Sequence, residues 1–258
     1  MTYSTYRPTF EDVTELLHPT KSYQEGDPRT QYWLKDGVVH FHDRAVEGAA
    51  STSFRFFLSG VAADSKHCYF NARLMRSLDS ASLREHSFAY HGDKNGIRTL
   101  TAELKGADVA TFAALDSGIR TIPGGVFPYI LIASGYAKDK NRAYFCDGGN
   151  AMPVVKADPA SFEAIADSFA ADDRFVFWGR ASLPKVKRHS WRRLAGAFST
   201  DGVLVYSCNR IIDGADPETF TVYPDKLDMF CYARDKHSYY GGSERVSRAE
   251  VERRVGDA

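Results

Sequence analysis

Apolar and polar positions follow one short pattern along much of the chain, and the pattern is clearest at residues 135–145. There the aromatic residue Tyr136 precedes Asp139 by three positions, and a second aromatic residue, Tyr144, follows it by five. Aromatic and β-branched residues suit a pleated, half-buried surface, and an aspartate at the start of a turn hydrogen-bonds the backbone two residues on. The pattern therefore predicts two β-strands joined by a tight turn.

This pattern, here called the first motif, recurs through the sequence, although the copy at Asp93 is degenerate. Seven copies are found, and their aspartates are spaced by 28, 29, 46, 33, 29 and 34 residues: Asp36, Asp64, Asp93, Asp139, Asp172, Asp201 and Asp235. The flanking residues are Trp33 and Phe41, Val61 and Tyr69, Tyr90 and Arg98, Tyr136 and Tyr144, Phe169 and Phe177, Phe198 and Tyr206, and Tyr232 and Tyr240. A period near 30 residues is typical of repeat proteins, whose stacked units bury apolar faces that one unit cannot bury alone.

A second motif follows most copies and ends in a large apolar residue. It is clearest at residues 157–162 and 214–220, which contain Asp158-Pro159 and Asp216-Pro217, and weaker at 48–54 and 106–112. Asp-Pro resembles a helix N-cap with proline at the first helical position, so we expect one short helical turn here. We expect the aromatic residues of both motifs to be buried: Tyr136, Tyr144, Phe162, Phe177, Phe198, Tyr206 and Phe220.

The pattern predicts a mainly β fold in a single domain over residues 1–258. Residues 1–31 are an N-terminal cap segment, residues 32–242 are seven hairpin repeats with an insertion at 113–134, and residues 243–258 are a C-terminal cap or tail. We expect short helices at both termini, with Thr9 and Ser247 as their caps. We expect an elongated, twisted array of hairpins, and the alternative is a β-propeller, whose blades are commonly longer at roughly 40–50 residues.

The first motif resembles the DKNYY family of bacterial repeat proteins, named for Asp-Lys-Asn and an aromatic pair. The resemblance is carried by residues 136–145 and 198–240, more weakly by 32–112, and not by 1–30 or 113–134. Several family members resemble immunity proteins encoded beside interbacterial toxins. The resemblance therefore implies a protein that binds a partner, and it offers no catalytic residues.

Composition sets limits on where the protein acts. The formal net charge is +0, so bulk electrostatics favours neither nucleic acid nor membrane. We find no signal peptide and no apolar run of the roughly 20 residues that span a bilayer, so we expect a cytoplasmic protein. The four cysteines would then be reduced. Cys146 and Cys208 occupy the same position, seven residues after an aspartate, which is typical of small core residues.

No residue pattern for an enzyme is found, so we expect no catalytic activity and no cofactor. His40 and His42 lie two residues apart on one predicted strand, a spacing that can hold zinc, but nothing in the sequence completes a site. The repeated aspartates can be read as calcium loops or as turn caps. Each turn offers one carboxylate beside a lysine in the clearest copies, which favours turn caps, and we expect no metal.

Partner binding is expected where the repeat is interrupted, because loops on a rigid scaffold often carry function. One candidate is the insertion, with Phe127 and Tyr129 as anchors. The other is a basic run that would attract an acidic protein: Arg180, Lys185, Lys187, Arg188, Arg192 and Arg193. The alternatives are a buried extra strand at 126–132 and a basic run that only solvates its repeat. Single-stranded nucleic acid is not expected, because Trp191 is the only aromatic residue interleaved with the basic run.

Two functions remain open at this stage. The first is an immunity-type protein, a monomer when free, that neutralises a cognate antibacterial toxin by occluding it. The second is an aromatic-repeat module that binds glycan or cell-wall material. The scarcity of tryptophan, with three residues, and the absence of an export signal favour the first.

Overall fold

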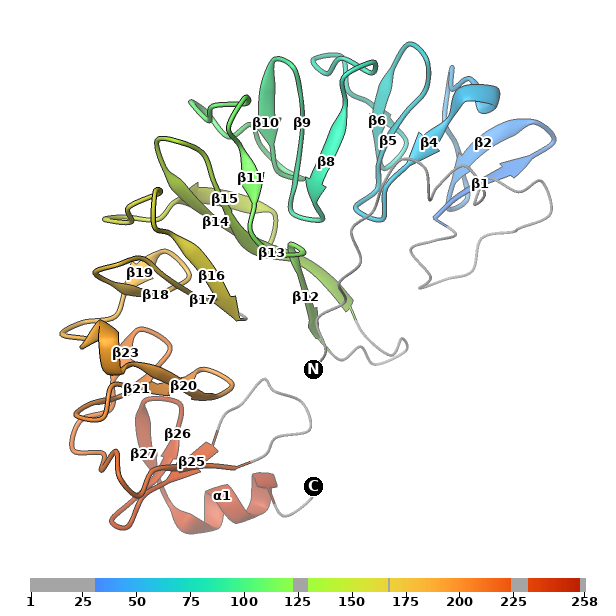
Figure 1. Ribbon diagram of the computed structural model, residues 1–258. Helices are drawn as coiled ribbons and strands as arrows, with labels where there is room; N and C mark the ends of the chain where they lie inside the picture. Colours follow the sequence, from blue (N-terminus) through green and yellow to red (C-terminus); the bar gives the residue numbers. More distant parts are fainter. Residues whose placement is uncertain (1–30, 123–129, 167, 224–231, 256–258) are drawn as a thin grey trace. The chain divides into compact units, whose positions relative to one another are not determined.

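The computed structural model describes residues 31–122, 130–166, 168–223 and 232–255. These residues form seven small antiparallel sheets, each made of three to five short strands that are consecutive in the sequence (Figure 1). The fold is therefore mainly β, as the sequence predicts. The predicted N-terminal helix lies outside the described residues. No helix in the described part of the chain is long and apolar enough to cross a membrane.

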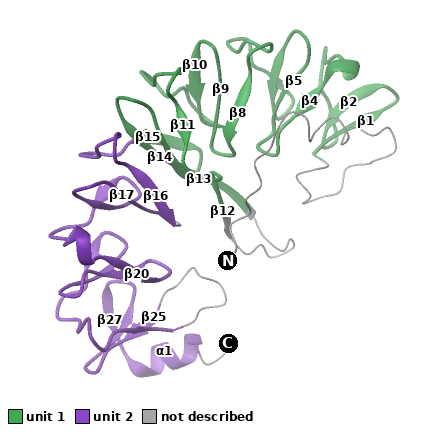
Figure 2. Ribbon diagram, in the orientation of Figure 1, with its two compact units in different colours: residues 1–121, 131–152 green, residues 122–130, 153–258 purple. Residues whose placement is uncertain are grey.

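The chain divides into two compact units, the first made of residues 1–121 and 131–152 and the second of residues 122–130 and 153–258 (Figure 2). The first four sheets belong to the first unit. Their strands are β1 (Tyr32–Lys35), β2 (Val38–Phe41) and β3 (Arg44–Ala45); β4 (Arg55–Phe56), β5 (Val61–Ala63), β6 (Cys68–Phe70) and β7 (Arg73–Leu74); β8 (Arg84–Ser87), β9 (Tyr90–Asp93) and β10 (Gly96–Arg98); and β11 (Ala113–Ala114), β12 (Ile119–Ile122), β13 (Ile130–Lys138), β14 (Ala143–Asp147) and β15 (Asn150–Pro153).

The second compact unit contains three four-stranded sheets and a helix. The strands are β16 (Glu163–Ala166), β17 (Phe169–Ala171), β18 (Val176–Trp178) and β19 (Ala181–Ser182); β20 (Arg192–Ala195), β21 (Phe198–Thr200), β22 (Val205–Ser207) and β23 (Arg210–Ile211); and β24 (Thr221–Val222), β25 (Tyr232–Arg234), β26 (Tyr239–Gly241) and β27 (Glu244–Val246). The helix α1 (Arg248–Val255) follows, and Ser247 Oγ accepts a hydrogen bond from the Glu250 N–H at its start. Repeats one to seven below are these seven sheets in chain order.

A buried aspartate closes the central hairpin of six repeats. In repeat four, Asp139 Oδ1 accepts hydrogen bonds from the backbone N–H groups of Asn141 and Arg142 at 2.7 and 2.8 Å. Its Oδ2 accepts hydrogen bonds from the Tyr144 hydroxyl and from the backbone N–H of Asp108, both at 2.8 Å. The same three backbone bonds are made by the other turn aspartates: Asp64, Asp93, Asp172, Asp201 and Asp235. The repeated aspartates are therefore turn caps.

The aromatic residue five positions after the aspartate supplies a fourth hydrogen bond in four repeats. The hydroxyl donors to the carboxylates are Tyr69, Tyr144, Tyr206 and Tyr240. Repeat five has Phe177 at this position and repeat three has Arg98, so their aspartates lack this donor. The first motif thus combines a turn cap with a buried ring that is fixed to the same carboxylate.

The second motif binds the aspartate that follows it in the sequence. The N–H donor to Oδ2 lies 14 residues before the aspartate in repeats two, three, five and six, 31 before it in repeat four and 19 in repeat seven. The predicted helical turn is wrong for the two Asp-Pro copies, where the backbone forms a turn. There the side chain of Asp158 or Asp216 accepts a nearby N–H. Short 3₁₀ turns occur instead at Ser51–Ser53 and Arg188–Ser190, where no Pro is present.

A hydroxyl three residues into the second motif links the two motifs again, and the sequence analysis missed it. Thr111 Oγ1 accepts a hydrogen bond from the Lys140 N–H at 3.0 Å, immediately after Asp139. The equivalent acceptors in other repeats are Ser53, Ser82, Ser161 and Thr219. The lysine after the aspartate also pairs with the second motif, since Lys140 Nζ lies 2.8 Å from Asp108 Oδ2. Lys94 with Asp79 and Lys236 with Asp216 repeat this ion pair.

Repeat one does not follow the predicted register. Strands β1 and β2 pair with Leu34 opposite Val39 and Lys35 opposite Val38, so Asp36 and Gly37 form the two-residue turn. Asp36 is exposed at φ +50°, and its side chain caps no segment among the described residues. The predicted alignment of Asp36, Trp33 and Phe41 with the first motif is therefore wrong, and the buried aromatic residue of β1 is Tyr32, one position before Trp33. A two-residue turn with positive φ closes this hairpin, so no buried carboxylate is needed.

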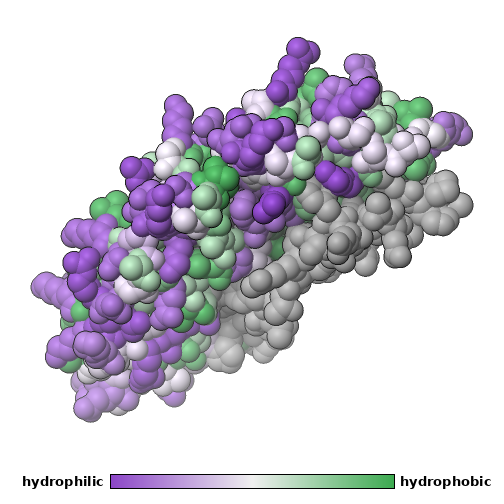
Figure 3. Space-filling model, turned by 45° about the horizontal axis from the view of Figure 1, so that its top comes forward, coloured by the Kyte–Doolittle hydropathy of each residue, from purple (hydrophilic) through white to green (hydrophobic). Residues whose placement is uncertain are grey.

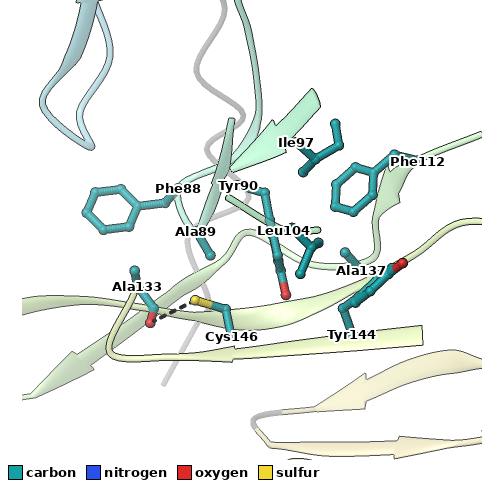
Figure 4. Close-up of a cluster of buried hydrophobic side chains, with 10 residues drawn as sticks. All are labelled: Phe88, Ala89, Tyr90, Ile97, Leu104, Phe112, Ala133, Ala137, Tyr144 and Cys146. Carbon is teal, nitrogen blue, oxygen red and sulfur yellow. Dashed lines mark hydrogen bonds between the residues drawn. The ribbon is translucent and has the colours of Figure 1, made fainter. Parts of the chain in front are cut away.

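The core consists of clusters formed by neighbouring sheets within each compact unit. One cluster joins Tyr90 and Ile97 of repeat three to Phe112, Tyr144 and Cys146 of repeat four, and Phe88 and several aliphatic residues complete it (Figure 4). In the second compact unit the equivalent clusters join repeats five and six and repeats six and seven. All seven aromatic residues predicted to be buried are at most 9% exposed, which confirms that prediction.

The four donors on Asp139 lead to a graded prediction for unfolding. Asp139→Ala is expected to lower the free energy of unfolding by about 3 kcal/mol or more, because hydrogen bonds to charged groups are worth roughly 1.5–3 kcal/mol each and buried N–H groups lose their acceptor. Tyr144→Phe removes one donor and keeps the ring, so about 1–2 kcal/mol is expected. Urea unfolding followed by circular dichroism measures both, and equal losses in the two variants would contradict the role assigned to the carboxylate.

The turn aspartates also predict acid lability. Burial by itself raises the pKa of Asp64, Asp139, Asp201 and Asp235, but the hydrogen bonds they accept together outweigh burial and hold each pKa below its ordinary value of 3.8. A group whose pKa is lowered by folding stabilises the protein above its ordinary pKa, and this stabilisation is lost as pH falls through the folded value. The free energy of unfolding is therefore expected to drop below about pH 4, and less steeply in Asp139→Asn.

Candidate functional site

The basic run lies on two neighbouring repeats of the second compact unit, but its members differ in their surroundings. Arg180 directly precedes β19, Lys185 lies three residues after its end at φ +56°, and Arg192 begins β20. The side chains of four members are exposed and make no ion pair with the residues that the structure describes: Arg180, Lys185, Lys187 and Arg192. We call these four residues the basic strip.

Two members of the run hold the fold together instead. The Arg188 side chain donates from Nε to the Asp172 carbonyl oxygen at 2.9 Å, and its Nη2 lies 3.6 Å from Glu163 Oε1. Arg193 donates from Nε to the carbonyl oxygen of Gly196 in its own hairpin at 3.3 Å. These contacts assign Arg188 and Arg193 structural roles, so they are poorer candidates for a partner contact than the basic strip.

The other predicted anchors, Phe127 and Tyr129, lie outside the described residues. The described part of the insertion is fixed by Asp116, whose carboxylate accepts hydrogen bonds from the N–H groups of Gly118 and Tyr136 at 2.9 and 2.8 Å. Burial raises the pKa of Asp116 to about 6, although both hydrogen bonds lower it. Gly118 has φ +69°, and a Cβ there would lie 2.6 Å from the backbone nitrogen of Ala89, so the insertion passes repeat three closely.

The repeat aromatics are turned inward. No Phe, Tyr or Trp among the described residues is exposed, and the exposed large apolar side chains there are aliphatic: Val38, Leu74, Met152, Val155, Ile165 and Val203. On the face drawn in Figure 3, hydrophobic residues form small separate patches among hydrophilic ones. Trp191 of the basic run is half-buried and its ring lies 5.2 Å from that of Phe169. The described surface therefore offers no aromatic platform for a sugar ring or a base.

The two histidines of repeat one have different surroundings in the described part of the chain. His40 Nδ1 lies 3.1 Å from the Val38 carbonyl oxygen, while His42 follows the end of β2 at φ +53° and stacks on Phe41. Within the described ranges, no three His, Cys, Asp or Glu side chains lie together in a way that could hold a metal ion. Cys68, Cys146 and Cys208 are free thiols.

Repeat three contains a row of polar side chains, buried at one end, that sequence reasoning missed. Strand pairing places Glu85 opposite His91, His91 opposite Arg98, and Arg98 opposite Glu103. The corresponding pairs in other repeats are a small residue facing a buried aromatic ring: Ala62 and Tyr69, Ala137 and Tyr144, Ala170 and Phe177, Ser199 and Tyr206, and Ala233 and Tyr240. Two features of the sequence could have indicated this row. Arg98 stands where the motif has an aromatic residue, and His91 stands where the other repeats have a small residue.

The inner end of this polar row is shut off from water. Glu85 Oε1 accepts a hydrogen bond from Ser59 of repeat two, whereas its Oε2 and the Nε2 of His91 are buried without a hydrogen-bond partner among the described residues. Burial raises the pKa of Glu85 to about 8, although the Ser59 hydrogen bond lowers it. Burial also lowers the pKa of His91 to about 4, and the positive charge of Arg98 adds to the effect. Near neutral pH the row is therefore largely uncharged at its inner end.

Glu85 gives the protein a predicted loss of stability as pH rises toward about 8. The folded state holds a proton on Glu85 that the unfolded state releases above pH 4.5, so this stabilisation is lost as pH rises through about 8. The free energy of unfolding is expected to fall between about pH 6 and 8, with a slope approaching about 1.4 kcal/mol per pH unit. Glu85→Gln should flatten this slope in urea unfolding, whereas the control Glu103→Gln at the exposed end should not. Identical slopes in all three proteins would show that Glu85 is not the titrating group.

The comparisons with known proteins identify a family and nothing more. The family model described as the DKNYY family matches residues 32–207, more than half of the chain, and the chain therefore belongs to the DKNYY family. No curated protein and no solved structure matches it. In repeat four, the aspartate of the motif is the turn cap Asp139, the lysine is Lys140 paired with Asp108, and Tyr144 donates its hydroxyl to the cap.

Proposed function

We propose that this member of the DKNYY family is an immunity-type binding protein that neutralises a cognate antibacterial toxin by occluding it. The observation that carries the proposal is the basic strip, because its four exposed cations lack acidic partners in the described part of a chain whose net charge is zero. Unpaired cations on one region of a neutral protein favour an acidic protein partner and accelerate encounter with it.

The scaffold supports binding rather than catalysis. Among the described residues, the groups whose pKa departs most from its ordinary value are spread over the repeats. They are buried core tyrosines and cysteines, the ion-paired Asp79 and Asp216, Asp116 of the insertion, and Glu85 and His91 of the polar row. A stable occluding complex would bury about 1,600 Å² in total. We propose that the protein is a cytoplasmic monomer when free and that the repeats continue as one open, twisted array with caps at both ends, rather than as a closed propeller.

The alternative function, an aromatic-repeat module for glycan or cell-wall material, has weaker support. Such modules need exposed rings on which sugars or choline groups stack, as cation–π recognition requires. The described aromatic residues are buried or half-buried, and most serve the core clusters. Retention of the protein on cell-wall material would favour this alternative.

The first test is co-purification of the chain with the product of the adjacent gene, followed by a toxicity assay in cells that express both. Reversal of the charge at Lys185 and Arg192 is expected to slow association roughly tenfold at low salt and less at high salt, because exposed charges are screened over about 10 Å at 0.1 M. The melting temperature should not change.

Reversal of the exposed residues Arg44 and Lys105 in the first compact unit is the matched control and should leave association unchanged. An association rate that is unchanged by charge reversal at Lys185 and Arg192 would show that the basic strip is not part of the interface. Protection of cells that persists after complex formation is lost would refute occlusion itself.

A further inference from the structure

A notch opens beside the hairpin turn of repeat two, in the first compact unit. It has a volume of about 320 Å³ and is lined by Lys66, His67, Leu74, Met75, Arg76 and Leu78. One wall is the Asp64 turn, and the other is the chain that leaves β7 toward the second motif of repeat three.

The backbone of both walls is fixed. The N–H groups of Lys66 and His67 donate to Asp64 Oδ1, both at 2.7 Å. On the opposite wall, the Met75 N–H donates to the Cys68 carbonyl oxygen at 2.8 Å, and the Leu78 N–H donates to Met75 at 3.4 Å. The side chains of the notch are therefore presented on a rigid frame, which lowers the entropy lost when a ligand binds.

The rim of the notch is positively charged and its acidic neighbours are engaged. Lys66 and Arg76 are exposed and form no ion pair with the residues that the structure describes. The nearby carboxylate of Asp64 accepts four hydrogen bonds at the turn, and Asp79 is paired with Lys94 at 2.8 Å. His67 Nδ1 lies 4.0 Å from Asp64 and adds a third cation when protonated. A ligand with two negative groups would complement this rim.

The floor of the notch is aliphatic. Leu78 is buried, Met75 is half-buried and Leu74 is 42% exposed, so an apolar group entering the notch would cover surface that water now touches. The equivalent turn of repeat five differs, because Arg174 lies over the ring of Phe175 at 5.3 Å and is already engaged. Repeat two thus combines free cations with an uncovered aliphatic floor.

We infer that this notch binds an acidic segment of a partner protein that inserts one aliphatic side chain between two carboxylates. A notch near the lower limit of the usual ligand-pocket range, roughly 300–1,000 Å³, and open to solvent on one side suits one side chain better than an enclosed small molecule. The inference rests on the proposed function in taking the partner to be an acidic protein. Its test uses no residue of the basic strip, so the two can fail separately.

The test is a titration of the ¹⁵N-labelled full chain with the capped peptide acetyl-Glu-Leu-Glu-amide, followed by amide resonances. Saturable shifts are expected at the notch residues. Binding of acetyl-Glu-Ser-Glu-amide and of acetyl-Gln-Leu-Gln-amide should each be about tenfold weaker, because one lacks the apolar group and the other lacks the charges.

The double variant Lys66→Glu and Arg76→Glu should abolish the shifts, whereas the matched reversal of Arg44 and Lys105 should preserve them with the same melting temperature. Equal binding of the Glu-Ser-Glu peptide, or shifts spread evenly over all basic surfaces, would leave only nonspecific attraction and overturn the inference. The absence of saturable shifts in the wild type would overturn it as well.

Discussion

In six of the seven repeats, the structure depends on one carboxylate that is removed from water and surrounded by donors. A buried carboxylate is unfavourable unless hydrogen bonds satisfy it, and each turn aspartate meets that condition with three backbone N–H groups and, in four repeats, a tyrosine hydroxyl. Two of the N–H groups belong to the turn and the third belongs to a segment at least 14 residues away. A local turn and a nonlocal contact therefore form or fail together.

This coupling explains how most strands can be only two to four residues long in a stable fold. A strand of that length contributes few ladder hydrogen bonds, and an isolated hairpin is at best marginally stable in water. The carboxylate adds charge-assisted bonds at the hairpin turn, and the clusters between neighbouring sheets add burial of aromatic rings. The lysine and hydroxyl residues of the motifs tie the same two segments at the surface, where exposed ion pairs are worth little by themselves.

Much of the fold could be predicted from the sequence because both motifs carry their own physical chemistry. The turns, the buried aromatics and the mainly β class all follow from residue types at fixed distances. The sequence does not reveal that each second motif contacts the aspartate that follows it. The more regular distance is the one from the preceding aspartate to the apolar residue that ends the motif, at 18 to 23 residues. That distance marks a segment of nearly fixed length, but it does not say which aspartate the motif contacts. In repeat one, a two-residue turn replaced the buried cap and misled the alignment at Asp36.

The candidate site was less predictable because a basic residue looks the same in the sequence whether it is free or engaged. Arg188 and Arg192 belong to one basic run, yet only Arg188 has a carbonyl oxygen and a glutamate within reach. The polar row of repeat three was hidden for a related reason, since His91 and Glu85 become adjacent only through strand pairing. Burial of such a row contributes less to stability than a ring would, so repeat three gives up apolar packing for groups that titrate.

The spacing between second motif and aspartate has a further consequence for how such chains diversify. The two segments are joined by hydrogen bonds and not by a required length of chain, so the connection between them can lengthen from 14 to 19 or 31 residues while every bond is kept. Closing a longer loop costs only about 0.6 kcal/mol for each doubling of its length. Each of the six capped repeats thus contains one position where new sequence can be accepted while the surrounding architecture is inherited unchanged, and related proteins can acquire different surfaces there by insertion alone.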